Sequence, residues 1–299
     1  MTGTWTHTEI GMWESLGRSF EVGGHEVFAV DLRPTDPQVA GSPRGPEPLL
    51  IIHGFPTSSF DFAQLAPALA STRRVVAVDM LGFGLSAKPD LRYTMALQAD
   101  IVAGVVEQLG LDRLAMLTHD MGDTVGGELL ARSMEGSWSV EVTRRIVTNG
   151  SIYIGMANLT EGQQMLLALP DERVPEGPGR ELLSASLTAT LAPANSTVEM
   201  GAHAEVVCHQ GGDALLARTI RYVEERRANE RRFTGAIESH PAALHIIWGP
   251  EDPIAVPAMA DRLLEARPDA SLTWIEGAGH YPQIEAPEEF TAAVIRALS

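Results

Sequence analysis

The sequence has very little cysteine and comparatively little positive charge. Cys208 is the single cysteine among 299 residues, so the chain cannot form an intramolecular disulfide, and this composition fits a reducing compartment. Lysine and arginine together number 22 against 39 aspartate and glutamate residues, which gives a formal net charge of −17. This excess of negative charge argues against nucleic acid and anionic membrane surfaces as partners.

Long apolar runs are also missing. No stretch approaches the roughly 18 consecutive apolar residues that a membrane-spanning helix needs. The first residues, Met1 to Trp5, show neither the basic start nor the apolar core of a signal peptide. We therefore expect a cytoplasmic protein without membrane partners, and both a monomer and a homodimer stay open.

The sequence does contain a regular alternation of short apolar segments with longer amphipathic ones. This pattern predicts an α/β fold, with a mostly parallel central sheet and helices on both faces. A loop rich in proline and glycine is expected from Pro34 to Pro48. The predicted strands are 19–22, 26–32, 49–52, 74–78, 114–117, 146–148, 244–248 and 271–275, and the predicted helices are 60–70, 97–109, 124–133, 257–266 and a last one from 287.

The alternation stops at Gly150, where the sequence becomes helical in character and is broken by prolines. We interpret residues 150–235 as a helical cap inserted into a core domain made of residues 1–149 and 236–299. A separate helical domain beside the sheet is the alternative. The pairs Arg226-Arg227 and Arg231-Arg232 alternate with glutamates, which is typical of a solvated helix face with ion pairs four residues apart.

The segment from Thr118 to Asp123 lies between a predicted strand and a predicted helix. Strand, sharp turn and helix in this order are the context of a nucleophile elbow, and Asp120 stands at the exposed position of that turn. Gly122 leaves room for the turn to pass close to its neighbours. A carboxylate attacks alkyl carbon well because the product is an ordinary ester, whereas acyl transfer would produce a mixed anhydride. Alternatively, Asp120 is only a turn or helix-capping residue.

Two further polar residues follow predicted strands, at the edge of the sheet where open α/β folds place their sites. Asp252 comes after the strand that ends at Trp248, and His280 comes after the strand that ends at Ile275. The order nucleophile, acid, histidine along the chain is the order of α/β-hydrolases. Either residue could also be an ordinary turn residue.

The loop from His53 to Pro56 follows another predicted strand. A tight turn there would aim the N–H of Phe55 inward, and together with the N–H of Met121 it would form an oxyanion hole. We expect His53, Pro56 and His119 to contact the substrate, with bracing of the loop as the alternative for His53.

These motifs resemble the α/β-hydrolase superfamily, in the branch of epoxide hydrolases and haloalkane dehalogenases whose nucleophile is an aspartate. Within that branch the chain is most similar to the mesoderm-specific transcript proteins and their bacterial relatives, from about Pro48 to the C-terminus. A serine esterase is not expected, because no Gly-x-Ser-x-Gly motif occurs. The matching segments are 53–59, 79–86, 119–123, 220–222, 231–233, 249–253 and 280–283.

The resemblance implies hydrolysis through an alkyl-enzyme ester on Asp120, most simply of a small apolar epoxide to a vicinal diol, with water as the second reactant and no cofactor. Epoxide hydrolases protonate the departing oxygen from cap tyrosines, and here the cap segment offers Tyr222, at a matching position, and Tyr153, which follows its strand too closely. Haloalkane dehalogenases usually hold the halide with a tryptophan directly after the nucleophile. Met121 stands there and has no side-chain donor, which weakens the dehalogenase alternative.

Other classes of function stay open at this point. Another C–O or C–C hydrolase would use the same triad, and some proteins of this fold bind ligands without catalysis. His203, Cys208 and His209 cluster in the sequence, but their spacing fits no zinc pattern, so we expect no metal.

Overall fold

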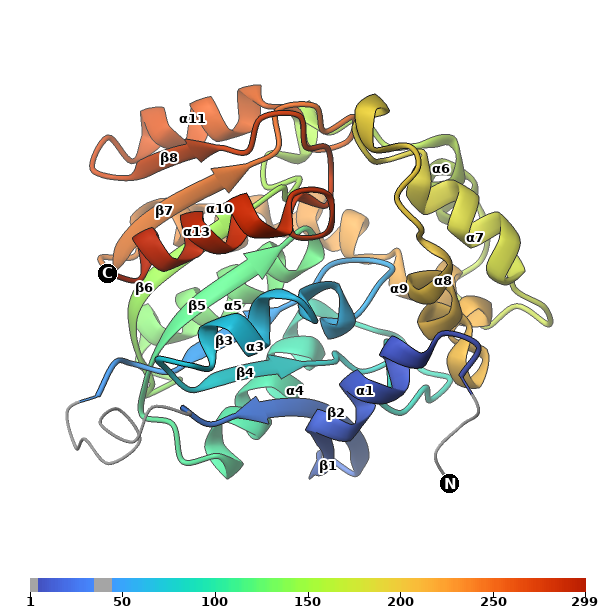
Figure 1. Ribbon diagram of the computed structural model, residues 1–299, viewed down its shortest axis with the longest axis horizontal. Coiled ribbons are helices and arrows are strands. Elements are labelled where there is room, and N and C mark those ends of the chain that lie inside the picture. The colour runs from blue at the N-terminus through green and yellow to red at the C-terminus, as the bar shows by residue number, and fades with distance from the viewer. Residues whose placement is uncertain (1–4, 35–44) are drawn as a thin grey trace.

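A sheet of eight strands forms the centre of the protein in the computed structural model, which describes residues 5–34 and 45–299 (Figure 1). The strand order is β1-β2-β4-β3-β5-β6-β7-β8. The pairs β1–β2 and β2–β4 are antiparallel, and every other neighbouring pair is parallel. This confirms the predicted α/β-hydrolase fold with a mostly parallel sheet. The strands are β1 (Gly17–Val22), β2 (His25–Leu32), β3 (Leu49–Ile52), β4 (Val75–Val78), β5 (Arg113–His119), β6 (Glu141–Thr148), β7 (Ala243–Trp248) and β8 (Ser271–Trp274).

Helices cover both faces of this sheet (Figure 1). The α-helices are α1 (Thr8–Leu16), α3 (Leu65–Leu69), α4 (Met95–Gln108), α5 (Met121–Glu135), α6 (Glu161–Ala168), α7 (Gly179–Thr188), α8 (Gly201–Cys208), α9 (Leu216–Thr219), α10 (Tyr222–Ser239), α11 (Ala258–Ala266), α12 (Pro282–Glu285) and α13 (Pro287–Ala297). Short 3-10 helices are η1 (Ser59–Phe62), η2 (Ile154–Met156), η3 (Pro193–Asn195) and η4 (His209–Leu215).

Strand β3 shows why the parallel strands appear in the sequence as continuous apolar runs. All four of its residues are fully buried. Leu49 and Ile51 belong to the core beneath α1, α3 and α13, whereas Leu50 and Ile52 belong to the core beneath α4, α5 and α10. Because side chains alternate along a strand, a strand covered on both faces needs an apolar residue at every position.

Some elements differ from the sequence-based predictions. Helix α1 was not predicted, because only Ile10 and Trp13 of its nine residues are buried and the apolar periodicity is weak. The helix predicted over 60–70 is divided into η1 and α3. Residues 1–4 and most of the predicted loop, 35–44, lie outside the described residues.

The segment interpreted as a cap is mainly helical, and α6, α7 and α8 lie together at one end of the sheet (Figure 1). The last helix of this segment, α10, continues to Ser239, so the predicted boundary at 235 falls inside a helix. A backbone kink at Asn229 (φ −126°, ψ 24°) divides α10 instead. Among the residues that the structure describes, no helix combines the length and the apolar character required to cross a membrane.

Helices α5 and α10 approach each other closely because α5 carries a glycine at the crossing. A Cβ atom on Gly127 would lie 2.7 Å from the carbonyl oxygen of Phe233. Ion pairs reinforce this contact, because Arg232 binds Glu128 at 2.5 Å and Glu135 at 2.7 Å. Arg232 therefore forms these ion pairs with residues of α5, whereas the sequence predicted ion pairs within its own helix.

We predict that Gly127→Ala lowers the free energy of unfolding by about 1–3 kcal/mol, the usual cost of overpacking a close contact. The matched control is Gly235→Ala in α10, where no atom lies within 4 Å of the added Cβ. This control should be stabilised by about 0.5–1 kcal/mol, because alanine favours a helix over glycine. Denaturant unfolding of both variants measures the difference. Equal effects would contradict the close α5–α10 packing.

Candidate active site

Asp120 lies in the sharp turn between β5 and α5, with a backbone conformation (φ 49°, ψ −112°) that few non-glycine residues adopt. Such a conformation costs about 1–3 kcal/mol and persists only when the surroundings enforce it. Two glycines allow neighbouring segments to pack closely around this turn. A Cβ on Gly54 would lie 2.7 Å from Cβ of Asp120, and one on Gly122 would lie 2.3 Å from the carbonyl oxygen of Ile52.

Asp120 is 1% exposed, and its two carboxylate oxygens have different surroundings. Oδ2 accepts a hydrogen bond of 2.9 Å from the backbone N–H of Phe55. Oδ1 is buried and has no hydrogen-bond partner within the described part of the chain. Met121 is the first residue of α5, so its N–H is one of the free donors at a helix start. One carboxylate oxygen is therefore held in place, and the other is available to react.

His280 and Asp252 meet beside this turn. Nδ1 of His280 lies 2.8 Å from Oδ2 of Asp252. The other carboxylate oxygen of Asp252 accepts hydrogen bonds from the N–H groups of Ile254 (2.7 Å) and Ala255 (3.0 Å). This arrangement fixes the imidazole ring through Nδ1 and leaves Nε2 for proton transfer.

The protonation of His280 depends on two neighbouring carboxylates. Burial favours the neutral ring, but the charge of Asp252, the hydrogen bond to it and the charge of Asp120 together raise the pKa of His280 to about 9. At neutral pH the imidazole is therefore protonated, with Asp252 as the larger cause and Asp120 as the smaller one.

Asn149 also belongs to the site, although the sequence interpretation did not include it. Its Nδ2 donates to Asp252 Oδ2 (2.9 Å) and to the carbonyl oxygens of Gly249 (3.2 Å) and Gly279 (3.1 Å). Asn149 follows β6, so its position at a strand end, which pointed to Asp252 and His280, would have pointed to it as well.

Arg226 is a second residue that the sequence interpretation missed. It was assigned to a solvated helix face, but it is 1% exposed, so that interpretation is wrong for this residue. Its guanidinium donates to the carbonyl oxygens of Asp120 (3.0 Å) and Ser151 (2.9 Å) and to Oγ1 of Thr124 (2.7 Å). It thus connects α10 to the turn that carries Asp120.

Tyr222 lies one helical turn before Arg226 and is 1% exposed. The guanidinium carbon of Arg226 lies 5.0 Å from the centre of the Tyr222 ring, and the centre of the Phe55 ring lies 5.6 Å from it. Burial raises the pKa of Tyr222 well above its usual value, and the charge of Asp120 raises it further, while Arg226 acts in the opposite direction. Tyr222 therefore stays protonated and close to Asp120.

Tyr153 does not reach this site. Its hydroxyl donates to Oε1 of Glu238 at 2.7 Å, and Arg262 lies over its ring at 4.3 Å. These contacts place Tyr153 between α10 and α11 and give its hydroxyl a partner of its own. We therefore do not propose a catalytic role for Tyr153.

The two histidines that were expected to contact the substrate are instead hydrogen-bonded to backbone atoms next to the site. His53 accepts from the N–H of Met80 at Nε2 (3.0 Å) and contacts Gly54 O through Nδ1 (2.8 Å), as expected of a loop-bracing residue. His119 Nε2 lies 2.8 Å from His280 O. Burial and the neighbouring charge of His280 lower the pKa of His119 to about 4, so its ring is neutral. Both side chains are completely buried.

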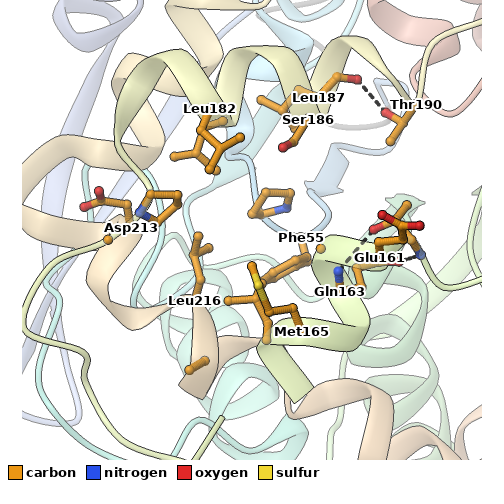
Figure 2. Close-up of a pocket in the computed structure, with 18 of the residues that line it drawn as sticks. Phe55, Glu161, Gln163, Met165, Leu182, Ser186, Leu187, Thr190, Asp213 and Leu216 are labelled. Carbon is orange, nitrogen blue, oxygen red and sulfur yellow. Dashed lines mark hydrogen bonds between the residues drawn. The ribbon is translucent and has the colours of Figure 1, made fainter. Parts of the chain in front are cut away.

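A cavity of about 620 Å³ is lined by residues of α6 and α7 and reaches His280 of the site (Figure 2). Leu182 and Leu187 of α7 face Met165 of α6 across it. At its inner end the cavity is lined by side chains next to Asp120, which itself is not part of the lining. These inner residues are Phe55, Pro56, Ile254, His280 and Tyr281.

The side chains of fixed charge along the cavity are all acidic. Glu161, Glu176 and Asp213 contribute to its outer part, and no lysine or arginine lines it within the described residues. In residues 5–34 and 45–299, no group of three or more metal-ligating side chains forms a site, and the sequence cluster at His203, Cys208 and His209 does not assemble into one.

Comparison with known proteins identifies the family. Residues 49–293 match the model of the alpha/beta hydrolase family. The chain belongs to this family. The putative hydrolase LipZ of Mycobacterium tuberculosis is 33% identical over 302 residues, which cover 98% of this chain and 99% of LipZ. The mesoderm-specific transcript homolog protein of Homo sapiens is 31% identical over 298 residues, with 94% and 85% covered.

Solved structures agree with the fold of this alpha/beta hydrolase. The enol-lactonase from Burkholderia xenovorans superposes with a TM-score of 0.74 at 18% identity, and the match covers 94% of this chain and 99% of that one. The predicted resemblance to alpha/beta hydrolases and to the mesoderm-specific transcript proteins is therefore confirmed.

We predict that Arg226→Gln lowers the free energy of unfolding by about 2–4 kcal/mol, because buried acceptors lose their donors and each such loss costs about 1–3 kcal/mol. The control is Arg227→Gln on the exposed side of α10. It should change stability by less than about 0.5 kcal/mol. Chemical denaturation measures the free energy of unfolding of both variants. An Arg226→Gln variant as stable as the wild type would show that this guanidinium does not stabilise the turn.

Proposed function

We propose that this alpha/beta hydrolase opens epoxides with water and releases vicinal diols. The observation that carries the proposal is the elbow carboxylate of Asp120, with one oxygen held by an N–H group and the other free within the described residues, beside a His280–Asp252 pair. A carboxylate in this position forms a stable ester with alkyl carbon, which suits epoxide chemistry better than acyl transfer.

Ring opening is the first step. Oδ1 of Asp120 attacks one epoxide carbon, and the electron pair of the breaking C–O bond moves to the ring oxygen. The hydroxyl of Tyr222 protonates that oxygen as general acid. The products of this step are an alkyl ester on Asp120, an alcohol group on the substrate and a tyrosinate.

Hydrolysis of the ester is the second step. The protonated His280 first passes its proton to the Tyr222 tyrosinate. The neutral ring then removes a proton from water, and the resulting hydroxide attacks the ester carbonyl carbon of Asp120. The N–H groups of Phe55 and Met121 stabilise the oxyanion, an interaction that typically contributes about 10²–10³ in rate. Collapse of the intermediate releases the diol and leaves Asp120 ionised, Tyr222 protonated and His280 protonated, as at the start. The two steps add epoxide and water to give diol, and they require no cofactor.

The pKa of His280 couples the two steps. In the free enzyme the charge of Asp120 contributes to a pKa of about 9, so His280 is protonated at neutral pH and cannot act as a base. Ester formation removes the charge of Asp120, which lowers the pKa of His280. This change, together with transfer of the His280 proton to the Tyr222 tyrosinate, favours a neutral ring that can act as a base once the ester has formed.

Dehalogenation is the alternative that uses the same nucleophile. A departing halide needs a donor such as a tryptophan N–H. No tryptophan lines the cavity in the described part of the chain, and the indole of Trp248 donates to Ala255 O at 2.9 Å. These observations favour an epoxide, whose oxygen a tyrosine can protonate.

The cavity indicates what kind of epoxide fits. Its lining is mostly apolar, and Glu161, Glu176 and Asp213 give its outer part a negative charge. An anionic substrate would be repelled there and would find no lysine or arginine to pair with among the described lining residues. We therefore propose neutral, apolar epoxides as substrates.

We predict that His280→Ala traps the ester, because Asp120 can still attack while the base for hydrolysis is gone. Intact-mass measurement after incubation with a panel of neutral alkyl and aryl epoxides should show the protein plus one whole epoxide. The control, Asp120→Ala combined with His280→Ala, should gain no mass. A panel of haloalkanes is measured in parallel.

An alkyl group gained without its halogen, and no epoxide adduct, would replace the proposed activity with dehalogenation. An adduct that persists in the double variant would remove Asp120 as nucleophile.

A further inference from the structure

Asp61 joins the loop that carries Phe55 to the cap through two hydrogen bonds. It belongs to η1, and its side chain is completely buried. Its Oδ2 accepts a hydrogen bond of 2.5 Å from the hydroxyl of Thr57, which lies two residues after Phe55. Its Oδ1 lies 2.9 Å from Nδ1 of His203. Because an ionised carboxylate only accepts hydrogen bonds, both neighbours are donors to it.

His203 comes from α8, a helix of the segment interpreted as the cap. The rings of His203 and Phe60 lie 5.0 Å apart. Ala202 and Val206 of α8 belong to the same apolar core as Phe60. Helix α8 is therefore packed against η1, and this packing fixes the contact between His203 and Asp61.

We propose that Asp61 is a positioning residue through which His203 of the cap holds the loop of residues 53–57 in place. This inference rests on the proposed formation of an ester at Asp120. The loop carries the N–H of Phe55, which lies 2.9 Å from Oδ2 of Asp120. Oδ2 becomes the carbonyl oxygen of the ester when Oδ1 attacks the substrate. The donor that faces this oxygen is thus held by a contact with the cap.

The charge on Oδ2 changes in opposite directions in the two steps of the reaction. During ring opening the Asp120 carboxylate loses its negative charge, so the hydrogen bond from Phe55 weakens towards the transition state. During ester hydrolysis negative charge develops on the carbonyl oxygen, so the same hydrogen bond strengthens. Only interactions that strengthen towards the transition state accelerate a step. The position of the Phe55 N–H therefore matters for hydrolysis and much less for ring opening.

A second buried contact on α8 provides the comparison. Glu205 is 1% exposed, and its Oε1 accepts a hydrogen bond of 2.9 Å from the N–H of Thr6. Its Oε2 lies 2.7 Å from Nδ1 of His7, and Arg180 of α7 pairs with the same carboxylate at 3.0 Å. This contact fixes the same helix to Thr6 and His7, which lie outside the proposed site.

We predict that His203→Leu slows ester hydrolysis about 10-fold and changes ester formation less than about twofold, since a misplaced group can cost up to about 10² in rate. Rapid quenching and intact-mass measurement during a single turnover of a neutral epoxide give both rates from one sample. Unfolded protein lowers the amplitude and leaves the ratio of the rates intact. His203→Asn should restore most of the hydrolysis rate, because its side-chain N–H can donate to Asp61.

Glu205→Leu is the matched control, because it breaks a buried contact of the same helix that does not lead to the loop. It should destabilise the protein and leave the ratio of the two rates as in the wild type. An unchanged ratio in His203→Leu, or the same change of ratio in both variants, would overturn the role of Asp61 and leave the proposed function in place.

The position of the loop is also measured without substrate, by the NMR chemical shift of the Phe55 N–H. A hydrogen bond to a carboxylate moves this proton to lower field, so His203→Leu should move it to higher field and Glu205→Leu should not. An unchanged Phe55 signal in His203→Leu would contradict the positioning role. The expected shift, with no ester on Asp120 from any epoxide, would support the contact between cap and loop and remove the proposed function.

Discussion

The position of the Asp120 carboxylate is the constraint on which the rest of the site depends. The Phe55 N–H holds Oδ2 at 2.9 Å from one direction, and Arg226 holds the backbone carbonyl at 3.0 Å from another. The two contacts come from segments that are distant in the sequence, a loop after β3 and the helix α10. Together they enforce a backbone conformation with positive φ, which would otherwise relax. The result is a fixed carboxylate whose Oδ1 has no hydrogen-bond partner among the described residues.

Charge balance follows from this arrangement. Two carboxylates, Asp120 and Asp252, and one imidazolium at His280 lie in a buried site, with the guanidinium of Arg226 nearby. The high pKa of His280, about 9, is a consequence of both carboxylates, so any reaction that neutralises Asp120 changes the strength of the base. We therefore propose that the ester forms while His280 is protonated and is hydrolysed while its ring is neutral.

Most of the fold could be predicted from the sequence, because buried parallel strands such as β3 need apolar residues at every position. Polar residues after strands indicated Asp120, Asp252 and His280, and the structure brings the last two within 2.8 Å. Arg226 could not be found in this way, because its charged neighbours are typical of an exposed helix. Its burial depends on acceptors at Asp120, Thr124 and Ser151, more than seventy positions away in the chain.

The fate of oxygen in a single turnover tests the central claim, that Asp120 forms an ester, most directly. Excess enzyme is mixed with a neutral epoxide in water labelled with heavy oxygen, and the protein and the diol are analysed by mass. Because water attacks the carbonyl carbon of the ester, one heavy oxygen should appear in the peptide that contains Asp120, and the first diol released should be unlabelled. Heavy oxygen in the first diol, with none on Asp120, would mean that water attacks the epoxide directly and would contradict the account.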